Sequence, residues 1–240
     1  MSSVKGTISK GNKGLTEQQV REVLDVLKNC YPDAECALDH GSIYQLVVAV
    51  SLSAQTTDAS VNKVTPALFA KYPEPRSLAE AGKKDFDAAV EDVTSMIRSI
   101  GMYRTKAQNV VKQAVAIVDN FGGQVPSDME SLMSLPGVGR KTANVVMAVG
   151  FGQQAMPVDT HVLRVSHRIG LAGESSEGNP NLTEKELISV IPHDRLTEAH
   201  HSLIFHGRAC CTARSPKCGE CRVAEYCCFF AASGENIFKK

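Results

Sequence analysis

The chain has 240 residues, of which 43% are hydrophobic, and it carries 26 basic and 26 acidic residues. This length suits one large or two modest folded domains, and no run reaches the roughly 20 apolar residues of a membrane helix. We therefore predict a folded protein with no membrane partner. A formal net charge of zero excludes nucleic-acid binding through overall charge, so any such contact must depend on a local cluster of basic residues.

The first 14 residues are polar and lack the apolar core of a secretion signal. We predict that residues 1–14 form a flexible N-terminal tail and that the protein stays in the cytoplasm. Cysteines in such a chain are more typical of metal ligands or buried thiols than of disulfides. Six of the eight cysteines lie between Cys210 and Cys228, and this clustering favours a metal-ligand site.

Helical periodicity dominates the chain and strand alternation is scarce, so we predict an all-α fold. Capping signals and apolar faces predict the helices in chain order. They cover 15–27, 43–54, 58–71, two short helices within 77–100, 105–121, 128–135, 141–149, 159–169, a helix that opens at Thr183, and 194–207.

A glycine-bearing turn joins two of these helices in the run LPGVGRKTANVV, residues 135–146. Gly137 and Gly139 permit a tight turn and a close approach of the backbone to a ligand. Free N–H groups at the start of the next helix, beside Arg140, are suited to bind a phosphate. An ordinary turn between helices is the alternative, but the whole run is far more specific than Gly-x-Gly. It predicts a helix–hairpin–helix that holds a nucleic-acid backbone.

Lys141 opens the second helix of this hairpin, where a lysine is poorly placed for a core and well placed to meet a ligand. A nucleophilic amine must be uncharged for part of the time near neutral pH. Asp159 begins a later helix, and its simplest role is that of an N-cap. Attack of an amine on a sugar carbon also needs a carboxylate that takes a proton and stabilises positive charge. We predict Lys141 as a nucleophile and Asp159 as its carboxylate partner.

The cysteine segment has the spacing of a four-thiolate site, C-x6-C-x2-C-x5-C. Four thiolates suit either a structural zinc ion or a [4Fe–4S] cluster, and the spacing does not choose between them. The doublets at 210–211 and 227–228 also leave the register open. Arg214 and Lys217 lie within the segment, and we predict that they contact a second stretch of phosphates. Solvated loop charge is the alternative for this pair.

Several runs together resemble the endonuclease III family, the iron–sulfur members of the helix–hairpin–helix DNA glycosylases. They are LSAQTTDASVNKVTPALF, IGMYRTKAQNV, LPGVGRKTANVV, PVDTHVLRVSHRIGL, HHSLIFHGR and the cysteine segment. The resemblance covers nearly all of residues 15–228. It implies two α-helical domains that flank a DNA cleft. One is a six-helix domain over 36–153, and the other is a cluster domain built from 15–35 and 154–240.

The same resemblance implies a [4Fe–4S] cluster and selects its ligands as Cys211, Cys218, Cys221 and Cys227. It implies that the protein works as a monomer on damaged double-stranded DNA, associated with the nucleoid. It further implies a bifunctional DNA glycosylase and AP lyase, which removes oxidised pyrimidines through a Schiff base on Lys141 and nicks the strand by β-elimination.

Three further residues are assigned to DNA contacts by this resemblance. The family flips its target nucleotide out of the duplex, and Gln55 resembles the residue that fills the vacated gap. Met102 occupies the position of the wedge between neighbouring bases, with Tyr103 beside it. Relatives often carry leucine at the wedge position, so the methionine bears on the preference for the opposite base.

Two alternative functions remain open from the sequence. An adenine-mismatch glycosylase shares the fold and the cluster, but that branch generally lacks a lysine at the position of Lys141. A non-catalytic DNA-binding module would keep the hairpin and the cluster without the chemistry. Covalent trapping on DNA separates a lyase from such a module.

Overall fold

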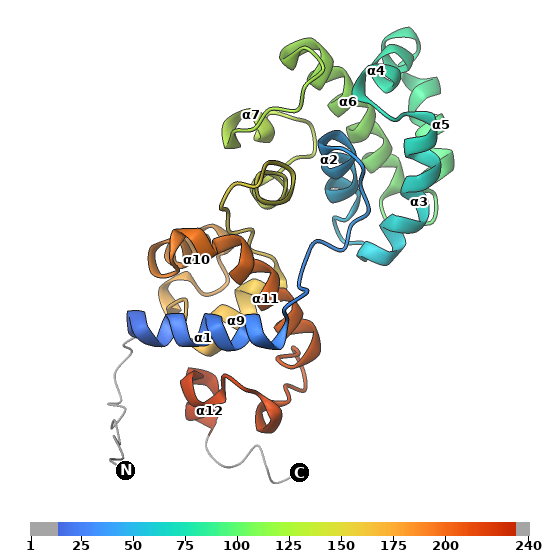
Figure 1. Cartoon of the computed structure of the whole chain (residues 1–240). Helices are drawn as coiled ribbons and strands as arrows, with labels where there is room; N and C mark the ends of the chain where they lie inside the picture. The colour runs from blue at the N-terminus through green and yellow to red at the C-terminus, as the bar shows by residue number, and fades with distance from the viewer. Residues whose placement is uncertain (1–13, 234–240) are drawn as a thin grey trace, which may run out of the picture. The chain divides into compact units, whose positions relative to one another are not determined.

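The computed structural model describes residues 14–233, so the predicted tail over 1–14 lies outside the described residues except for Gly14. All regular structure within this range is helical, with no strand, which confirms the predicted all-α fold (Figure 1). The α-helices are α1 (Glu17–Cys30), α2 (Ile43–Leu52), α3 (Asp58–Lys71), α4 (Pro75–Lys84), α5 (Phe86–Ile97), α6 (Tyr103–Phe121), α7 (Met129–Met133), α8 (Arg140–Val145), α9 (Thr160–Ile169), α10 (Pro180–Val190), α11 (Leu196–Ala209) and α12 (Cys228–Ser233). None of the helices described could cross a membrane, since none is both long and apolar enough.

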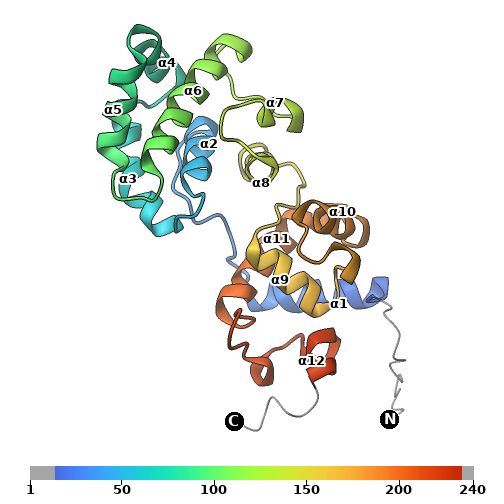
Figure 2. The same ribbon diagram turned by 180° about the vertical axis from the view of Figure 1, so that it is seen from behind.

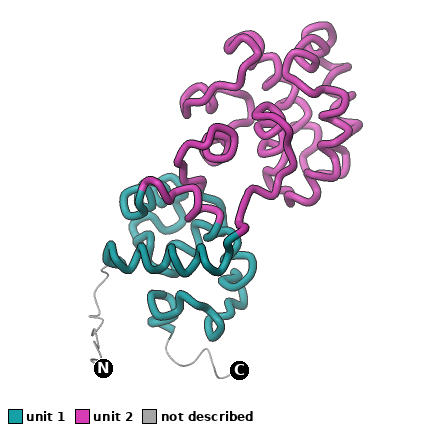
Figure 3. The backbone as a smooth tube through the Cα atoms, in the orientation of Figure 1, with its two compact units in different colours: residues 1–32, 158–192, 202–240 teal, residues 33–157, 193–201 magenta. Residues whose placement is uncertain are grey.

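The chain divides into two compact units, which Figure 3 colours separately. The first unit contains residues 1–32, 158–192 and 202–240, and the second contains 33–157 and 193–201. Helix α11 contributes to both. The domain limits expected from the resemblance, 36–153 and 15–35 with 154–240, stay a prediction.

The second unit is built around α2, whose residues 46–50 are all buried. A helix that is apolar on every side needs neighbours all round, and α2 packs against α3, α6 and α8. Helices α4 and α5 pack on α6, and Figure 2 shows these three from behind. The predicted break within 77–100 falls at Asp85, which ends α4 and caps α5 by accepting from the Ala88 N–H at 3.0 Å.

The first unit contains α1, α9, α10, α12 and the end of α11. The predicted capping box at the start of α1 is present, because the Thr16 hydroxyl and the Gln19 side chain bond each other's backbone N–H. The apolar face of α1 is buried, and α12 packs against α9.

Three helices begin earlier than the sequence predicts, and one of them, α4, begins at Pro75 rather than at residue 77. Helix α6 begins at Tyr103, and its N-cap is Met102 rather than Thr105. Helix α10 begins at Pro180 after the N-cap Asn179, rather than at Thr183. A proline in the first helical turn costs no hydrogen bond, because its missing N–H has no partner within the helix there.

Candidate functional site

The turn that precedes Lys141 is fixed by the packing of its own residues. Leu135 and Val138 are buried, and the Val138 N–H donates to the Leu135 carbonyl at 3.0 Å. Gly137 between them has a φ of +77°, and a Cβ at this position would lie 2.7 Å from Nδ2 of Asn109 on α6. Both the backbone conformation and the available space therefore require glycine at 137.

Gly139 meets no such constraint. It is the N-cap of α8, its φ is −94°, and a Cβ there would point into open space. No side chain caps this end of the helix, so the first N–H groups of α8 are left for solvent or a ligand. Arg140 and the exposed Lys141 are the first two residues of α8. Gly137, Gly139, Arg140 and Lys141 therefore lie together on this turn and at the start of α8.

Helix α8 does not continue as a regular α-helix. It passes into a π-helical turn over Val146–Gly150. The predicted helix over 141–149 thus contains a change in winding that capping and periodicity signals do not reveal, and π-turns are frequent near functional sites.

Asp159 is the N-cap of α9, in the first unit, whereas Lys141 belongs to the second. Its Oδ1 accepts from the backbone N–H groups of His161 and Val162, each at 2.8 Å. Both cap bonds use Oδ1, so Oδ2 has no hydrogen-bond partner within residues 14–233. The carboxylate can therefore cap the helix and still offer one oxygen for proton transfer. The His161 ring lies 3.2 Å from Arg164 on the same helix, in line with a structural role.

Gln55 and Met102 share an uncommon backbone conformation. Their φ angles are +53° and +54°, and no other non-glycine residue within 14–233 has a positive φ. Such residues are strained and gather at functional sites. Both are exposed, and Met102 keeps 51% of its surface accessible. Tyr103 follows as the first residue of α6, with Arg104 5.7 Å from the centre of its ring.

The cysteine segment lines a small pocket that is partly open to solvent. The four predicted ligands all line it, together with Cys210, whereas Cys228 is exposed and does not. The residues that line the pocket therefore favour Cys227 over Cys228 as the last ligand. Burial raises the pKa of Cys221 to about 12 and that of Cys227 to about 11. A positively charged metal centre would hold these sulfurs as thiolates, so the donor set fits an iron–sulfur cluster.

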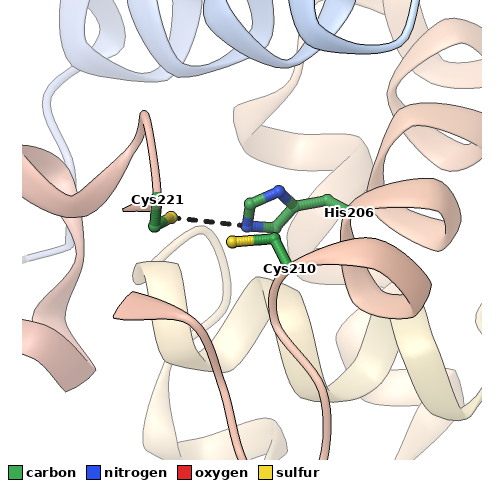
Figure 4. A group of neighbouring side chains, drawn as sticks. All are labelled: His206, Cys210 and Cys221. Carbon is green, nitrogen blue, oxygen red and sulfur yellow. Dashed lines mark hydrogen bonds between the residues drawn. The ribbon is translucent and has the colours of Figure 1, made fainter. Parts of the chain in front are cut away.

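One imidazole contacts this pocket directly. Nε2 of the buried His206 lies 3.6 Å from Sγ of Cys221, with Cys210 beside them (Figure 4). Nδ1 of His206 lies 3.1 Å from the hydroxyl of Tyr31, the residue that follows α1. Burial lowers the pKa of His206 to about 4, so the ring is neutral at pH 7 and presents one N–H. Side chains of this kind orient sulfur ligands.

Two arginines on α9 hold the start of the cysteine segment. Arg164 donates to the carbonyls of Gly207 at 2.9 Å and Cys211 at 3.1 Å. Arg168 donates to the carbonyls of Thr212 at 2.8 Å and Ala213 at 3.0 Å. Its guanidinium also lies 3.5 Å from the Cys211 sulfur and 4.7 Å from the centre of the Phe229 ring. The helix that Asp159 caps thus anchors the cysteine segment as well.

Arg214 and Lys217 are exposed on the loop that follows Cys211. The loop is ordered by two bonds, from the Thr212 hydroxyl to the Ser215 carbonyl at 2.6 Å and from the Lys217 N–H to the Cys210 carbonyl at 3.0 Å. Neither basic side chain forms an ion pair within the described part of the chain. Their charge is therefore available to a ligand.

The sequence reasoning missed Arg164, Arg168 and His206. A signal was present for the arginines, because residues four apart on a helix share a face and both follow the Asp159 cap in the run DTHVLRVSHR. The signal for His206 is weaker. This histidine lies near the end of a predicted helix, four residues before Cys210.

Two regions of the chain match models of known protein families. Residues 48–193 match the family model of the HhH-GPD superfamily base excision DNA repair proteins, and residues 211–227 match the iron–sulfur binding domain of endonuclease III. The second match begins at Cys211 and ends at Cys227, and it confirms the predicted [4Fe–4S] cofactor.

Individual relatives match over most of their length. Endonuclease III of Bacillus subtilis (strain 168) is 45% identical over 89% of this chain and 93% of its own, and that of Escherichia coli (strain K12) is 40% identical over 86% and 93%. A solved structure of a trapped endonuclease III–DNA covalent intermediate is 44% identical and superposes with a TM-score of 0.82, covering 91% of this chain and 99% of its own. The chain belongs to the endonuclease III family of the HhH-GPD base excision repair superfamily.

Proposed function

We propose that this protein is a bifunctional DNA glycosylase and AP lyase that removes oxidised pyrimidines from double-stranded DNA. The observation that carries the proposal is Lys141, an exposed amine in the first turn of α8, directly after a glycine turn that leaves the helix start uncapped. It is supported by a relative that was trapped as a covalent intermediate with DNA.

The chemistry begins with the neutral amine of Lys141 attacking C1′ of the flipped nucleotide. The bond from C1′ to the base breaks, and the base leaves with the electron pair and takes up a proton. The amine loses its proton and the sugar ring opens, which gives a Schiff base between Nζ and C1′. Removal of a C2′ proton then expels the 3′ phosphate by β-elimination and nicks the strand. Asp159 moves protons through Oδ2 and stabilises positive charge on the sugar as the base departs.

The remaining predicted residues bind the DNA or hold the cluster. Gly137, Gly139 and Arg140 bind the phosphates around the lesion, and Arg214 and Lys217 bind a second stretch. Gln55 fills the gap, and Met102 enters the stack with Tyr103 beside it. Cys211, Cys218, Cys221 and Cys227 would hold the cluster as thiolates, and their bonds to it would stiffen the cysteine loop.

We further propose that the protein works as a monomer in the cytoplasm, at the nucleoid, where its DNA substrate lies. All of the assigned catalytic and DNA-binding residues come from one chain. Gel filtration of the protein with a short lesion duplex tests this point, with one protein per duplex as the expected result.

Borohydride reduction on a duplex with one abasic site tests the nucleophile. We expect the wild type to give a covalent protein–DNA adduct, because borohydride reduces the Schiff base to a stable amine. Lys141→Gln should give none while it still binds the duplex. Lys185→Gln, which changes an exposed lysine on α10, should trap like the wild type. An adduct of undiminished yield in Lys141→Gln would contradict the assignment, and binding without any wild-type adduct would indicate a non-catalytic module.

Asp159→Asn tests the carboxylate separately from the cap. Asparagine caps helices as well as aspartate does, so the fold should be retained. We expect base release in single-turnover assays to slow by about 100-fold, within the range for loss of a general acid or base. Base release at the wild-type rate would leave Asp159 with only its capping role.

A further inference from the structure

Helix α6 buries polar side chains on the face that supports the DNA-contacting turns. Lys106, Asn109 and Gln113 follow one another at spacings that place them on the same side of the helix. Lys106 and Gln113 have 5% and 0% of their surface exposed. Gln113 donates to the Ser51 hydroxyl at 2.8 Å and to the carbonyl of Pro136 in the hairpin at 2.7 Å. This polar face therefore connects α6 with α2 and with the hairpin.

Lys106 forms hydrogen bonds to the two turns that contain the residues with positive φ, Met102 and Gln55. Its backbone N–H donates to the Met102 carbonyl at 3.0 Å. Its Nζ donates to the Thr56 hydroxyl at 2.7 Å, and that hydroxyl lies 3.4 Å from the Ala54 carbonyl, to which it donates. The bond between Thr56 and Ala54 spans Gln55. One residue thus holds Met102 through its backbone and the Gln55 turn through its side chain.

This arrangement is costly for the fold. Burial lowers the pKa of Lys106, and within residues 14–233 the ammonium makes no ion pair. A lysine is rarely this buried unless it is paired with an opposite charge. A methionine of similar length would fill the same space without the desolvation cost. Stability alone therefore does not account for a lysine here.

We propose that Lys106 is a positioning residue that fixes the separation and orientation of Gln55 and Met102 before they enter the duplex. The proposal rests on the function proposed above for these two residues. Two strained turns that are joined in advance do not have to be ordered when DNA binds, so the extrusion step loses less conformational entropy. Without the bond, each turn would sample other conformations, and extrusion of a paired nucleotide would slow.

Lys106→Met and Thr56→Val test the proposal by removing the donor or the acceptor at nearly constant size. Lys112→Met is the matched control, because Lys112 is exposed on the same helix and receives the same substitution. Single-turnover base release is measured on two duplexes. In one, a ring-saturated thymine faces adenine. In the other, the same lesion faces a gap of one nucleotide, so that there is no pair to break.

We expect Lys106→Met to slow base release about 10-fold on the paired duplex, as for loss of a hydrogen bond to a charged group. On the gapped duplex the change should be less than about twofold, since no base pair opposes extrusion. Thr56→Val should show the same pattern, and the double variant should be no worse than either single variant, because both remove one interaction. A wild-type rate on the paired duplex, or equal losses on both duplexes, would overturn the proposal.

A second measurement separates this proposal from the chemistry. In each variant, 2-aminopurine opposite the lesion reports insertion through its fluorescence when the protein binds. If the fluorescence rises with the wild type and rises much less with Lys106→Met, the result supports Lys106 as a positioning residue, even if no base is released. Equal rises in both proteins would overturn it. Absence of base release from the wild type, by contrast, would count against the proposed glycosylase alone.

Discussion

The two glycines of the hairpin have different physical reasons for being glycine. Gly137 is required by its φ of +77° and by the Asn109 side chain, whereas Gly139 has an ordinary backbone conformation and open space beside it. The fold therefore explains the first glycine. For the second we propose a ligand that approaches the backbone closely, as a phosphate would.

Alanine substitutions at the two positions should separate stability from binding. Gly137→Ala should lower the free energy of unfolding by about 1–3 kcal/mol, because it combines left-handed strain with a clash. Gly139→Ala should cost at most about 1 kcal/mol, the difference between glycine and alanine at an N-cap, yet it should weaken lesion-duplex binding about 10-fold or more. Thermal melts and fluorescence anisotropy measure the two effects. Unchanged DNA affinity in Gly139→Ala would mean that no phosphate lies against this residue.

Among the elements, α9 serves two purposes at once. Its first residue follows the Asp159 cap, and its arginines bind carbonyls of the cysteine segment through three hydrogen bonds. The planar guanidinium of Arg168 reaches two adjacent carbonyls, a geometry that the ammonium of lysine does not reproduce. The element that presents the proposed catalytic carboxylate thus also sets the path of the chain around the cluster.

Arg168→Lys should loosen the cluster while preserving the charge. Loss of hydrogen bonds to the carbonyls of Thr212 and Ala213 should cost about 1–3 kcal/mol and shorten the lifetime of the cluster in the presence of an iron chelator. Visible absorbance and bound iron per chain follow the loss. Arg222→Lys, an exposed arginine in the same segment, is the control and should keep wild-type kinetics. Equal lifetimes in the two variants would show that Arg168 does not secure the loop.

At the scale of the whole molecule, part of the charge is used internally. Helices α3 to α6 pair Lys71 with Asp92 at 2.6 Å and also join Lys83 with Asp119. Such pairs neutralise part of the basic charge locally. The charge of Arg214 and Lys217 is not used in this way, so a chain with zero net charge can still present a basic loop. The salt dependence of binding should therefore come from few residues.

The double variant Arg214→Ala with Lys217→Ala tests that expectation. DNA affinity should fall, and the slope of log K against log salt should become shallower by about 1 to 2, since each phosphate contact contributes about 0.9. Titrations at several salt concentrations measure the slope. A change of Lys28 and Lys185 to alanine, which removes two exposed charges elsewhere, should leave it unaltered. A wild-type slope in the loop variant would place the loop away from the DNA.

Local pattern was sufficient for much of the fold and for part of the site. Apolar periodicity and caps predicted the α-helices except α12, with different starts for α4, α6 and α10. The hairpin run was also recognised from the sequence, and the roles of its residues stay a prediction. The [4Fe–4S] cofactor came from the family resemblance, because cysteine spacing also suited zinc. The bond from Lys106 to Thr56 spans 50 residues, and the bond from Arg168 to Thr212 spans 44. Such contacts arise from how helices pack, which no local signal encodes. The pairing of Lys141 with Asp159 stays a prediction.

The left-handed conformation of Gln55 and Met102 bears on how such an enzyme could be made more heat-resistant. A side chain in that region costs about 1–2 kcal/mol relative to glycine, so selection for thermal endurance alone would favour glycine at both places. Under the roles proposed for Gln55 and Met102, the same replacements would remove the side chains that fill the gap and enter the base stack. A gain in melting temperature achieved there would thus come with slower extrusion of the damaged nucleotide, and engineers should seek extra robustness elsewhere.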